Sequence, residues 1–461
     1  MILPPKDFLT HSMREKSWGI KAARILSAAL AAVEPGKAVK KFLIKNGNQL
    51  TIGEEVLNPK DFNRIFLIGV GKAAFPMCSA AADILAEDLT RGFILTKPGS
   101  YQLPDSYAET FELLYGGHPL PNPDSIKSTK RITDQLINLT TNDLVILLLS
   151  GGGSALFCAP SPGISLDDLI KTTQCLLASG ADIKEINTLR KHISEVKGGQ
   201  LARKTGPAKT VTLILSDVMG DPLDMIASGP TVPDPSTFQN ALDVIQKYDL
   251  QNTLPLPVIE RISSGCKGAH PETPKPGDPV FTNTSQHIIG NNLDAVQAGL
   301  HQAEREGFNA GILPDVLDGE AHLVGAKLGE FLCRMAREEK PLPRPACLIG
   351  GGETTVTLPT DGEVGRGGRN LETALGAVQL LNGLPNGAII TLATDGEDGV
   401  TDAAGAVVTG DSFSRSQNLQ VDSEYCLQDH NSYFFFKALD DLLLIGQTQT
   451  NVNDLCFLFT F

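Results

Sequence analysis

Apolar residues form two kinds of segment that alternate through the first half of the chain. Short continuous runs such as LVILLLS at 144–150 are typical of strands buried on both faces of a parallel sheet. Longer segments such as 124–139 carry apolar residues at helical spacing among polar ones. Further strands are predicted at 64–69, 92–96, 111–116 and 210–217, and further helices at 14–33, 75–87, 165–179 and 182–204. This alternation predicts an α/β fold whose mostly parallel sheet is flanked by helices.

A segment rich in Pro, Gly and Ser at 252–280 interrupts this pattern. We therefore expect a linker at 261–280 that joins an N-terminal domain at 1–260 to a smaller C-terminal α/β domain at 281–461. The string SQHIIGNN at 285–292 is expected to open the second α/β series. Later strands are predicted at 311–315, 346–352 and 388–396, and helices at 293–306 and 320–338.

The net charge and the cysteine content argue against a nucleic-acid-binding, membrane or disulfide-bonded protein. The 461 residues carry a formal net charge of −14, and such a surface repels nucleic-acid phosphates and anionic lipid. No apolar run reaches the roughly 18 residues needed to span a bilayer, and the N-terminus lacks a signal-peptide pattern. The eight cysteines show no paired spacing, which favours free thiols in a reducing compartment. We expect a cytoplasmic protein that binds small molecules, without nucleic-acid or membrane partners.

Five glycine-rich loops follow predicted strands, at 69–74, 150–155, 216–222, 350–356 and 393–399. In open α/β sheets ligands bind at the carboxyl ends of strands, where such loops expose backbone amides to anions. The first loop, GVGKAA, fits a dinucleotide fingerprint, but its next strand ends in Thr96-Lys97 and not in the acid that holds the ribose of NAD. Lys97 leaves NADP open, and a Walker A loop is absent. The loops therefore predict a site for anionic groups.

Two basic positions are candidates for phosphoryl chemistry. Lys72 follows a glycine turn at a predicted helix start, where it can reach a transferred phosphoryl group, although an exposed helix-start lysine is the alternative. Arg369 lies in GRGGRN, at 365–370, just before another predicted helix. With Arg366 it is expected to form a flexible anion clamp, because arginine binds carboxylate or phosphate through two hydrogen bonds. The alternative is a charged surface hairpin tip.

Acidic residues at strand ends suit Mg²⁺, which takes one or two carboxylates and completes its shell with water and phosphate. Asp217, Asp221 and Asp395 are the candidate metal ligands, whereas Asp398 and Asp402 are interpreted as turn residues. His118 is either a substrate contact or a loop histidine, and His192 is interpreted as a packing residue on a helix. Ser154 is not in a nucleophile motif, so its loop is expected to bind through backbone donors.

Several long strings occur in a fixed order and resemble one family, the class II glycerate 2-kinases with a MOFRL-type C-terminal part. They are GVGKAA, GGHPLPN, LLSGGGSAL, INTLRKHISEVKGGQLA, LILSDVMGDPLDMIASGPTVPDP, GGETTVTL, GRGGRNLE, TDGEDGVTDAAGA and TNVNDL. The resemblance runs from about residue 10 to the end of the chain. It implies a Rossmann-like N-terminal domain, a MOFRL-type C-terminal domain and a site in the cleft between them.

The same resemblance implies transfer of the ATP γ-phosphoryl group to the 2-hydroxyl of D-glycerate with Mg²⁺. It matches Lys72 and Arg369 to the family's essential residues, and Asp217 is our candidate to accept the hydroxyl proton. The candidate substrate and nucleotide contacts are Gly71, His118, Gly151, Gly152, Gly153, Ser154, Arg190, Asn291, Glu353, Thr354 and Asn370. We expect a monomer or a homodimer.

Two other functions stay open: an NAD(P)H-dependent hydroxypyruvate reductase, and a sensor of sugar acids or nucleotides without catalysis. The sequence departs from the family's usual GPTGTN loop, which reads GQTQTN at 446–451. The apolar tail CFLFTF is expected to pack as a final helix or strand.

Overall fold

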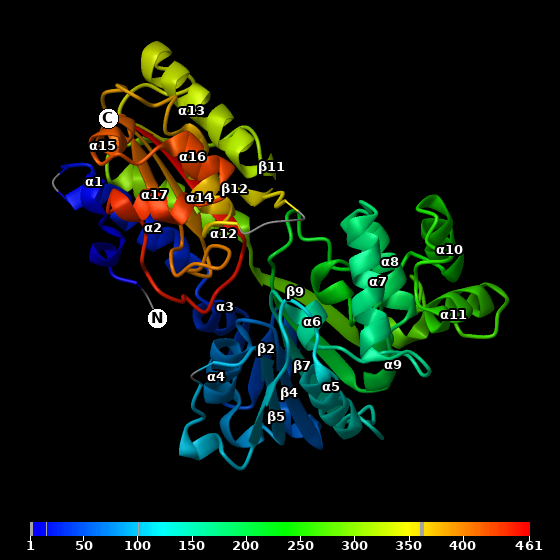
Figure 1. The fold of residues 1–461 in the computed structure, drawn as a ribbon. Helices are drawn as coiled ribbons and strands as arrows, with labels where there is room; N and C mark the ends of the chain where they lie inside the picture. Colours follow the sequence, from blue (N-terminus) through cyan, green and yellow to red (C-terminus); the bar gives the residue numbers. More distant parts are fainter. Residues whose placement is uncertain (1–2, 15, 100, 360–363) are drawn as a thin grey trace. The chain divides into compact units, whose positions relative to one another are not determined.

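The computed structural model describes residues 3–14, 16–99, 101–359 and 364–461. The chain forms two compact units (Figure 1). One is the continuous segment Pro35–Ile289, and the other combines Met1–Glu34 with Gly290–Phe461. We call them the central unit and the terminal unit. Their boundaries differ from the sequence-based domains, because the first 34 residues pack with the C-terminal half of the chain.

The central unit is built on a six-stranded sheet in the order β6-β5-β4-β7-β8-β9. Its strands are β4 (Arg64–Val70), β5 (Arg91–Thr96), β6 (Phe111–Tyr115), β7 (Asp143–Leu149), β8 (Lys209–Leu215) and β9 (Thr284–Gly290). The pairs β4–β5, β5–β6, β4–β7 and β7–β8 are all parallel. Counted from β4 as the first strand, the order is that of the dinucleotide-binding fold, and it reverses between β4 and β7.

The strand predicted at 285–292 is β9, the sixth strand of this sheet, so it completes the first α/β series instead of opening the second. Periodicity identifies a strand, but its sheet is decided by long-range hydrogen bonding. Part of the predicted linker at 261–280 is likewise ordered, because it contains the end of α11 (Leu256–Cys266). That helix contributes Val258 and Ile262 to an apolar core.

Helices cover this sheet and form a second cluster beside it (Figure 1). Helix α4 (Ala74–Leu85) packs on β4 and β5, and α5 (Pro123–Gln135) packs on β6. Apolar residues of α7 (Leu166–Ala178), α8 (Ile183–His192), α10 (Phe238–Lys247) and α11 form a separate core. Capping boxes begin α5, α7, α8 and α10, so the starts of these helices are fixed by local sequence.

The helix predicted at 182–204 is two helices, α8 and α9 (Gln200–Thr205). Gly198 and Gly199 interrupt it with φ values of 55° and 78°, which side-chain-bearing residues rarely adopt. A Cβ at Gly199 would also lie 2.9 Å from the carbonyl oxygen of Val232. The break places Lys197 in a loop, from which its ammonium reaches the segment after β7.

A three-stranded antiparallel sheet follows α3 (Pro35–Phe42) and was not expected from the sequence. It consists of β1 (Leu43–Asn46), β2 (Gln49–Ile52) and β3 (Glu55–Leu57). Gly47-Asn48 between the first two strands is a hairpin signal, with Gly47 at a φ of 60°. This dipeptide could have revealed the hairpin.

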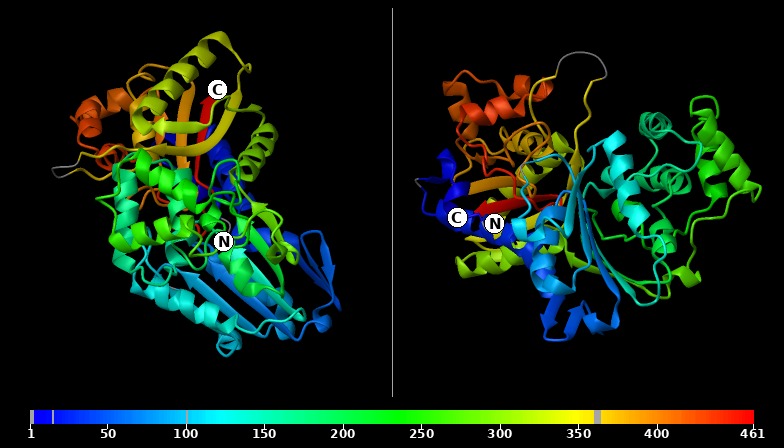
Figure 2. Two further views of the ribbon diagram at one scale, coloured as in Figure 1. Left: turned by 90° about the vertical axis from the view of Figure 1, so that its right-hand side faces the viewer. Right: turned by 90° about the horizontal axis from the view of Figure 1, so that it is seen from below.

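The terminal unit has a mixed sheet in the order β10-β12-β15-β13-β14, with β11 also paired to β12. The strands are β10 (Asn309–Ile312), β11 (Leu317–Glu320), β12 (Ala346–Thr355), β13 (Gly387–Ala393), β14 (Val407–Thr409) and β15 (Asp454–Thr460). Figure 2 shows the red C-terminal strand β15 among the yellow and orange strands. It runs antiparallel to both β12 and β13 and is buried along its length, which confirms that the apolar tail packs as a final strand.

The helices of the terminal unit come from both ends of the chain. They are α1 (His11–Arg14), α2 (Gly19–Ala32), α12 (Asn292–Arg305), α13 (Ala321–Glu338), α14 (Arg369–Ala377), α15 (Ser412–Asn418), α16 (Ser423–Gln428) and α17 (Ser432–Ala438). Helix α2 packs against α12, and α13 against α14. Ser12 donates its backbone N–H and its hydroxyl to Asp441, each over 2.8 Å. Among the described residues, no helix is long and apolar enough to cross a bilayer.

Candidate active site

The loops after β4 and β7 touch where the strand order of the central unit reverses. The backbone N–H of Lys72 donates to the carbonyl oxygen of Gly151 over 2.8 Å, and that of Ala73 donates to Ser150 Oγ over 3.0 Å. Gly71 permits this approach, because a Cβ there would lie 2.2 Å from Ser150 Oγ. Two of the predicted anion loops are therefore joined at the position where such folds bind ligands.

Three predicted site residues gather at this junction: Lys72, His118 and Gly152. A Cβ at Gly152 would lie 2.9 Å from Cδ2 of His118 and 3.4 Å from Cγ of Lys72. Gly152 has a φ of 84°, and it begins the one-turn helix α6 (Gly153–Leu156). His118 is exposed, whereas Lys72 is half-buried. The structure thus places a cation and an imidazole beside glycine backbone, an arrangement suited to an anion.

Hydrogen bonds connect the loop after β7 to Ser228 and, through it, to helix α8. Ser154 Oγ lies 2.9 Å from Ser228 Oγ, and Ser228 donates to Asn187 Oδ1 over 3.0 Å. Gly153 packs closely, since a Cβ there would lie 2.8 Å from Cβ of Ala227. The hydroxyl of Ser154 is therefore held by neighbouring side chains, and binding by this loop through its backbone stays a prediction.

Lys197 was missed by sequence analysis. Its ammonium donates to the carbonyl oxygens of Ser154 and Phe157 over 2.7 and 3.3 Å, and burial lowers the pKa of Lys197 to about 8. Arg190, a predicted contact residue, lies near it in the last turn of α8, where burial also lowers the pKa of the guanidinium. The Gly198-Gly199 pair in KGGQ was the available signal, because it marks the break that brings Lys197 to this loop.

The candidate metal ligands occur in both units. Asp217 and Asp221 lie in the loop after β8, with Asp221 at a φ of 55°. Asp395 follows β13, where its Oδ1 accepts the backbone N–H of Glu397 over 3.2 Å. Throughout the described ranges, no three His, Cys, Asp or Glu side chains form a group that could hold a metal. Since Mg²⁺ needs only one or two carboxylates, these three residues stay a prediction.

Arg369 is the first residue of α14 and forms ion pairs with two acids. Its Nε lies 2.6 Å from Asp454 Oδ2, and its Nη1 contacts Glu353. Burial lowers the pKa of Arg369, but Asp454 and Glu353 outweigh this effect and raise it. Burial raises the pKa of Asp454 to about 7, and the Arg369 charge opposes that rise. Asp454 was not predicted, although it lies in the string TNVNDL.

Asp398, interpreted as a turn residue from the sequence, caps α14 instead. Its carboxylate accepts the backbone N–H groups of Asn370 and Leu371 over 3.0 and 2.8 Å, and Nδ2 of Asn370 over 3.2 Å. Burial raises the pKa of Asp398 to about 6, against these hydrogen bonds. Asn370 therefore has a structural partner. Thr354, also predicted as a contact, is buried with its hydroxyl 3.3 Å from that of Thr373.

The two arginines of GRGGRN do not share partners. Arg366 pairs with Asp402 over 3.1 Å and lies over the ring of Tyr433, 4.2 Å from its centroid. Arg369 pairs with Glu353 and Asp454, so the two side chains are held separately, and their joint action as an anion clamp stays a prediction. Asn291, another predicted contact, caps α12 by accepting the backbone N–H of Asp294 over 3.0 Å.

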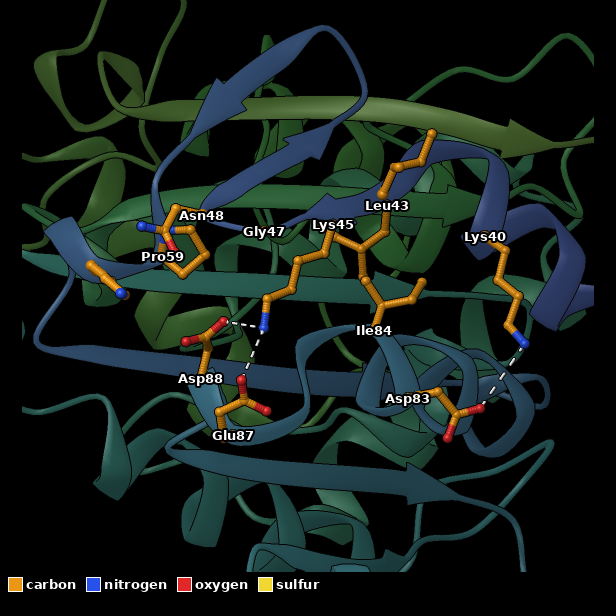
Figure 3. Close-up of a pocket in the computed structure, with 12 residues that line it drawn as sticks. Lys40, Leu43, Lys45, Gly47, Asn48, Pro59, Asp83, Ile84, Glu87 and Asp88 are labelled. Carbon is orange, nitrogen blue, oxygen red and sulfur yellow. Dashed lines mark ion pairs between the residues drawn. The ribbon is translucent and has the colours of Figure 1, made fainter.

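A pocket of about 680 Å³ elsewhere in the central unit has a different character. Figure 3 shows Lys40 and Lys45 in its wall, each facing acids. Lys45 Nζ lies 2.5 Å from Asp88, and Lys40 Nζ lies 4.0 Å from Asp83. Both of these lysines thus face acids of the same wall, and the pocket is a weaker candidate for an anion than the junction beside Lys72.

Comparisons with known proteins identify the family of this chain. Residues 21–263 match a family described as a domain of unknown function (DUF4147), and residues 346–454 match the MOFRL family. A D-glycerate 2-kinase of Thermotoga maritima is 40% identical over 434 residues, covering 94% of this chain and 96% of the relative. An Agrobacterium vitis protein provisionally named hydroxypyruvate reductase is 39% identical, covering 97% of each chain.

A crystal structure described as glycerate kinase from Thermotoga maritima aligns with a TM-score of 0.81. It is 39% identical in sequence, and the alignment covers 95% of this chain and 98% of that one. Coverage of this extent in sequence and fold includes both units. The chain therefore belongs to the class II glycerate 2-kinase family, the MOFRL-type glycerate kinases.

Proposed function

We propose that this chain transfers the γ-phosphoryl group of ATP to the 2-hydroxyl of D-glycerate, giving 2-phosphoglycerate and ADP. The observation that carries the proposal is the junction at the strand-order reversal, where Lys72 lies against Gly151 and Gly152. A D-glycerate 2-kinase that shares 40% identity over nearly the whole chain supports the same substrate. Phosphoryl transfer depends mainly on positioning and charge neutralisation, which such a junction can supply.

The residues fit the phosphates of a nucleotide. Gly71, Gly152 and Gly153 lie where a Cβ would fill the space beside the loops, so the backbone amides can be approached closely. Lys72 can neutralise the charge that develops on the transferred group. Mg²⁺, when bound, supplies charge neutralisation on the phosphates, and its candidate ligands stay Asp217 and Asp221 of the central unit and Asp395 of the terminal unit.

Arg369 is proposed to bind an anion by exchanging one of its partners. Glu353 is half exposed, whereas Asp454 is buried, so an incoming phosphate or carboxylate can replace Glu353 while Asp454 keeps the guanidinium oriented. Lys72 and Arg369 lie in different units, and their joint action in one reaction stays a prediction. The same holds for Asp217 as the group that accepts the hydroxyl proton.

An ADP-release assay with ATP, Mg²⁺ and D-glycerate tests the proposal, with L-glycerate and glycerol as comparison substrates. We expect turnover with D-glycerate and a product that NMR identifies as the 2-phosphate. Lys72→Ala should lower kcat by about 10³-fold, since it removes charge at the transferred group. The exposed Lys130→Ala is the control and should retain wild-type kcat. No ADP release with D-glycerate, or full activity of Lys72→Ala, would contradict the proposal.

Reduction of hydroxypyruvate is the second candidate, because the strand order and the GVGKAA loop suit a dinucleotide. Strand β5, however, ends at Thr96 and is followed by Lys97, so the acid that binds the ribose of NAD is missing. NADH or NADPH oxidation in the presence of hydroxypyruvate distinguishes the two reactions. A sensor without catalysis would instead bind ligand without turnover, and Lys72→Ala would change only its affinity.

We also infer that the enzyme acts in the cytoplasm. All eight cysteines are free thiols, and five of them are buried. Free buried thiols are typical of proteins in a reducing compartment. Fractionation of cells that express the full chain tests this inference, and recovery in a membrane or secreted fraction would contradict it.

A further inference from the structure

Two cations below the loop after β7 lack the acidic partners that buried charges normally have. Lys191 shows the ordinary arrangement, since its Nζ lies 3.0 Å from Asp224 and 3.3 Å from Asp234. Arg190 precedes it in sequence and is partly buried. Within the described ranges no carboxylate pairs with Arg190, and its guanidinium takes part in no hydrogen bond.

Lys197 adds a second positive charge without a carboxylate. It is 6% exposed, and its ammonium contacts only the carbonyl oxygens of Ser154 and Phe157 within the part of the chain that the structure describes. Arg190 and Lys197 are close enough for the guanidinium to disfavour the charged ammonium. Among the residues that the structure describes, the region around Ser154 therefore carries two like charges and no carboxylate that pairs with them.

The position of Arg190 links it to the same loop. Asn187 lies three residues earlier, on the same side of α8, and connects through Ser228 to Ser154. Arg190 is intermediate in exposure, so part of the residue is open to solvent. It thus combines partial burial with access, next to a loop that exposes backbone amides.

The helix dipole alone does not account for this arrangement. Arg190 is in the last turn of α8, where the helix dipole stabilises a cation. That stabilisation is smaller than the cost of removing a charge from water. Lys191 and His192 lie in the same last turn and have acidic neighbours, Asp224 and Asp234 for the first and Glu272 for the second. Arg190 is the exception, which points to a partner supplied from outside the chain.

We propose that the guanidinium of Arg190 binds an oxyanion of a substrate beside the loop Gly151–Ser154. The planar fork of arginine fits two oxygens of a carboxylate or a phosphate. The oxyanion belongs either to the hydroxy acid or to the nucleotide. This inference rests on the proposed function, which brings both ligands to the protein, and it adds the group that holds one of them.

Titration calorimetry without turnover tests the proposal and identifies the source of the oxyanion. D-glycerate is compared with its uncharged amide, and ADP with adenosine. Arg190→Gln should weaken binding of one anion by about 10- to 100-fold and leave its uncharged analogue unchanged. Loss confined to D-glycerate assigns the carboxylate, and loss confined to ADP assigns the phosphate.

Arg203→Gln is the matched control, because Arg203 is a neighbouring arginine with protein partners, Gln200 and the carbonyl oxygen of Glu272. It should bind all four ligands as the wild type does. Arg190→Lys keeps the charge but not the fork, so it tests the proposal if the glutamine variant does not fold. Anion affinities within twofold of wild type in a folded Arg190 variant would overturn the proposal. Failure of the proposed function would appear separately, as absent ADP release by the wild-type enzyme.

Discussion

Arg369 and Asp454 form an ion pair that joins the start of α14 to the start of β15, with Nε 2.6 Å from Oδ2. A second contact, from Nη2 to Oδ1, measures 3.4 Å. These two contacts orient the guanidinium, since Asp454 lies on a central strand and is almost fully buried. Asp454, near the end of the chain, thereby orients the side chain of Arg369, which lies 85 positions earlier.

Removing the charge of Asp454 should therefore impair the function of Arg369. We expect Asp454→Asn to lower kcat/KM for D-glycerate about 10-fold, equivalent to about 1.4 kcal/mol, because the guanidinium loses its buried anchor. Asp402→Asn is the matched control, since Asp402 pairs with the other arginine of the same segment, Arg366, at an exposed position. Steady-state kinetics of the two variants provide the measurement. Equal activities of the two would show that the buried pair does not orient Arg369.

The buried acids of the terminal unit predict a particular pH dependence of stability. The pKa of Asp454 is raised to about 7 in the folded protein, above its ordinary value of 3.8. Between these values the folded state binds a proton that the unfolded state releases, so the contribution of Asp454 to the free energy of unfolding falls as pH rises. The slope reaches at most about 1.4 kcal/mol per pH unit.

Urea unfolding of wild type and Asp454→Asn at pH 5 and pH 8 measures this effect. The stability of the wild type relative to the variant should be greater at pH 5 and should decrease by pH 8. Titrating groups far from Asp454 are common to both proteins and cancel in the difference, whereas Asp398 interacts with Asp454, so the difference reports Asp454 together with this coupling. A relative stability that increases with pH would show that the folded-state pKa of Asp454 is lowered.

Alanine substitutions at Gly152 and Gly163 distinguish the effect of backbone strain on stability from an effect on ligand binding, because the two glycines have nearly the same φ. Gly152 and Gly163 have φ values of 84° and 86°, so alanine at either position should cost roughly 1–2 kcal/mol. Only at Gly152 would the new methyl group meet other groups, His118 and Lys72, whereas nothing lies within 4 Å at Gly163. We expect similar falls in Tm for the two variants, but a fall in kcat/KM of about 10-fold or more only for Gly152→Ala. Equal activities would mean that ligands do not approach Gly152.

The pairing of Lys191 predicts a large effect on stability. Lys191 and Asp234 are both buried, so Lys191→Met would leave Asp234 without its nearest cation and should cost about 3–5 kcal/mol. Lys130 forms an exposed ion pair with Asp134 one helical turn away, and Lys130→Met should cost about 0.3–0.5 kcal/mol. Urea unfolding of both variants checks the contrast. A loss below 1 kcal/mol for Lys191→Met would indicate that Asp234 is stabilised mainly by Ser236 and Thr273.

The sequence by itself determined those strands and helices whose apolar residues follow a clear strand or helix pattern. The continuous apolar run at 144–150 became β7, and the glycine loop after it met the loop that carries Lys72. These predictions held because a strand buried on both faces must be apolar throughout, and because carboxyl ends of neighbouring parallel strands share one edge. The polar spacing of Asn122 and Ser125 likewise fixes the start of α5 by local hydrogen bonding.

Only the tertiary structure decided which distant segments join. It assigned β9 to the first sheet, placed the first 34 residues with the C-terminal half and put β15 at the centre of the second sheet. It also revealed Asp454 beneath Arg369 and Lys197 beneath Ser154. Local sequence carries propensity and periodicity, whereas these pairings depend on which surfaces exclude water together and which buried charges find a partner.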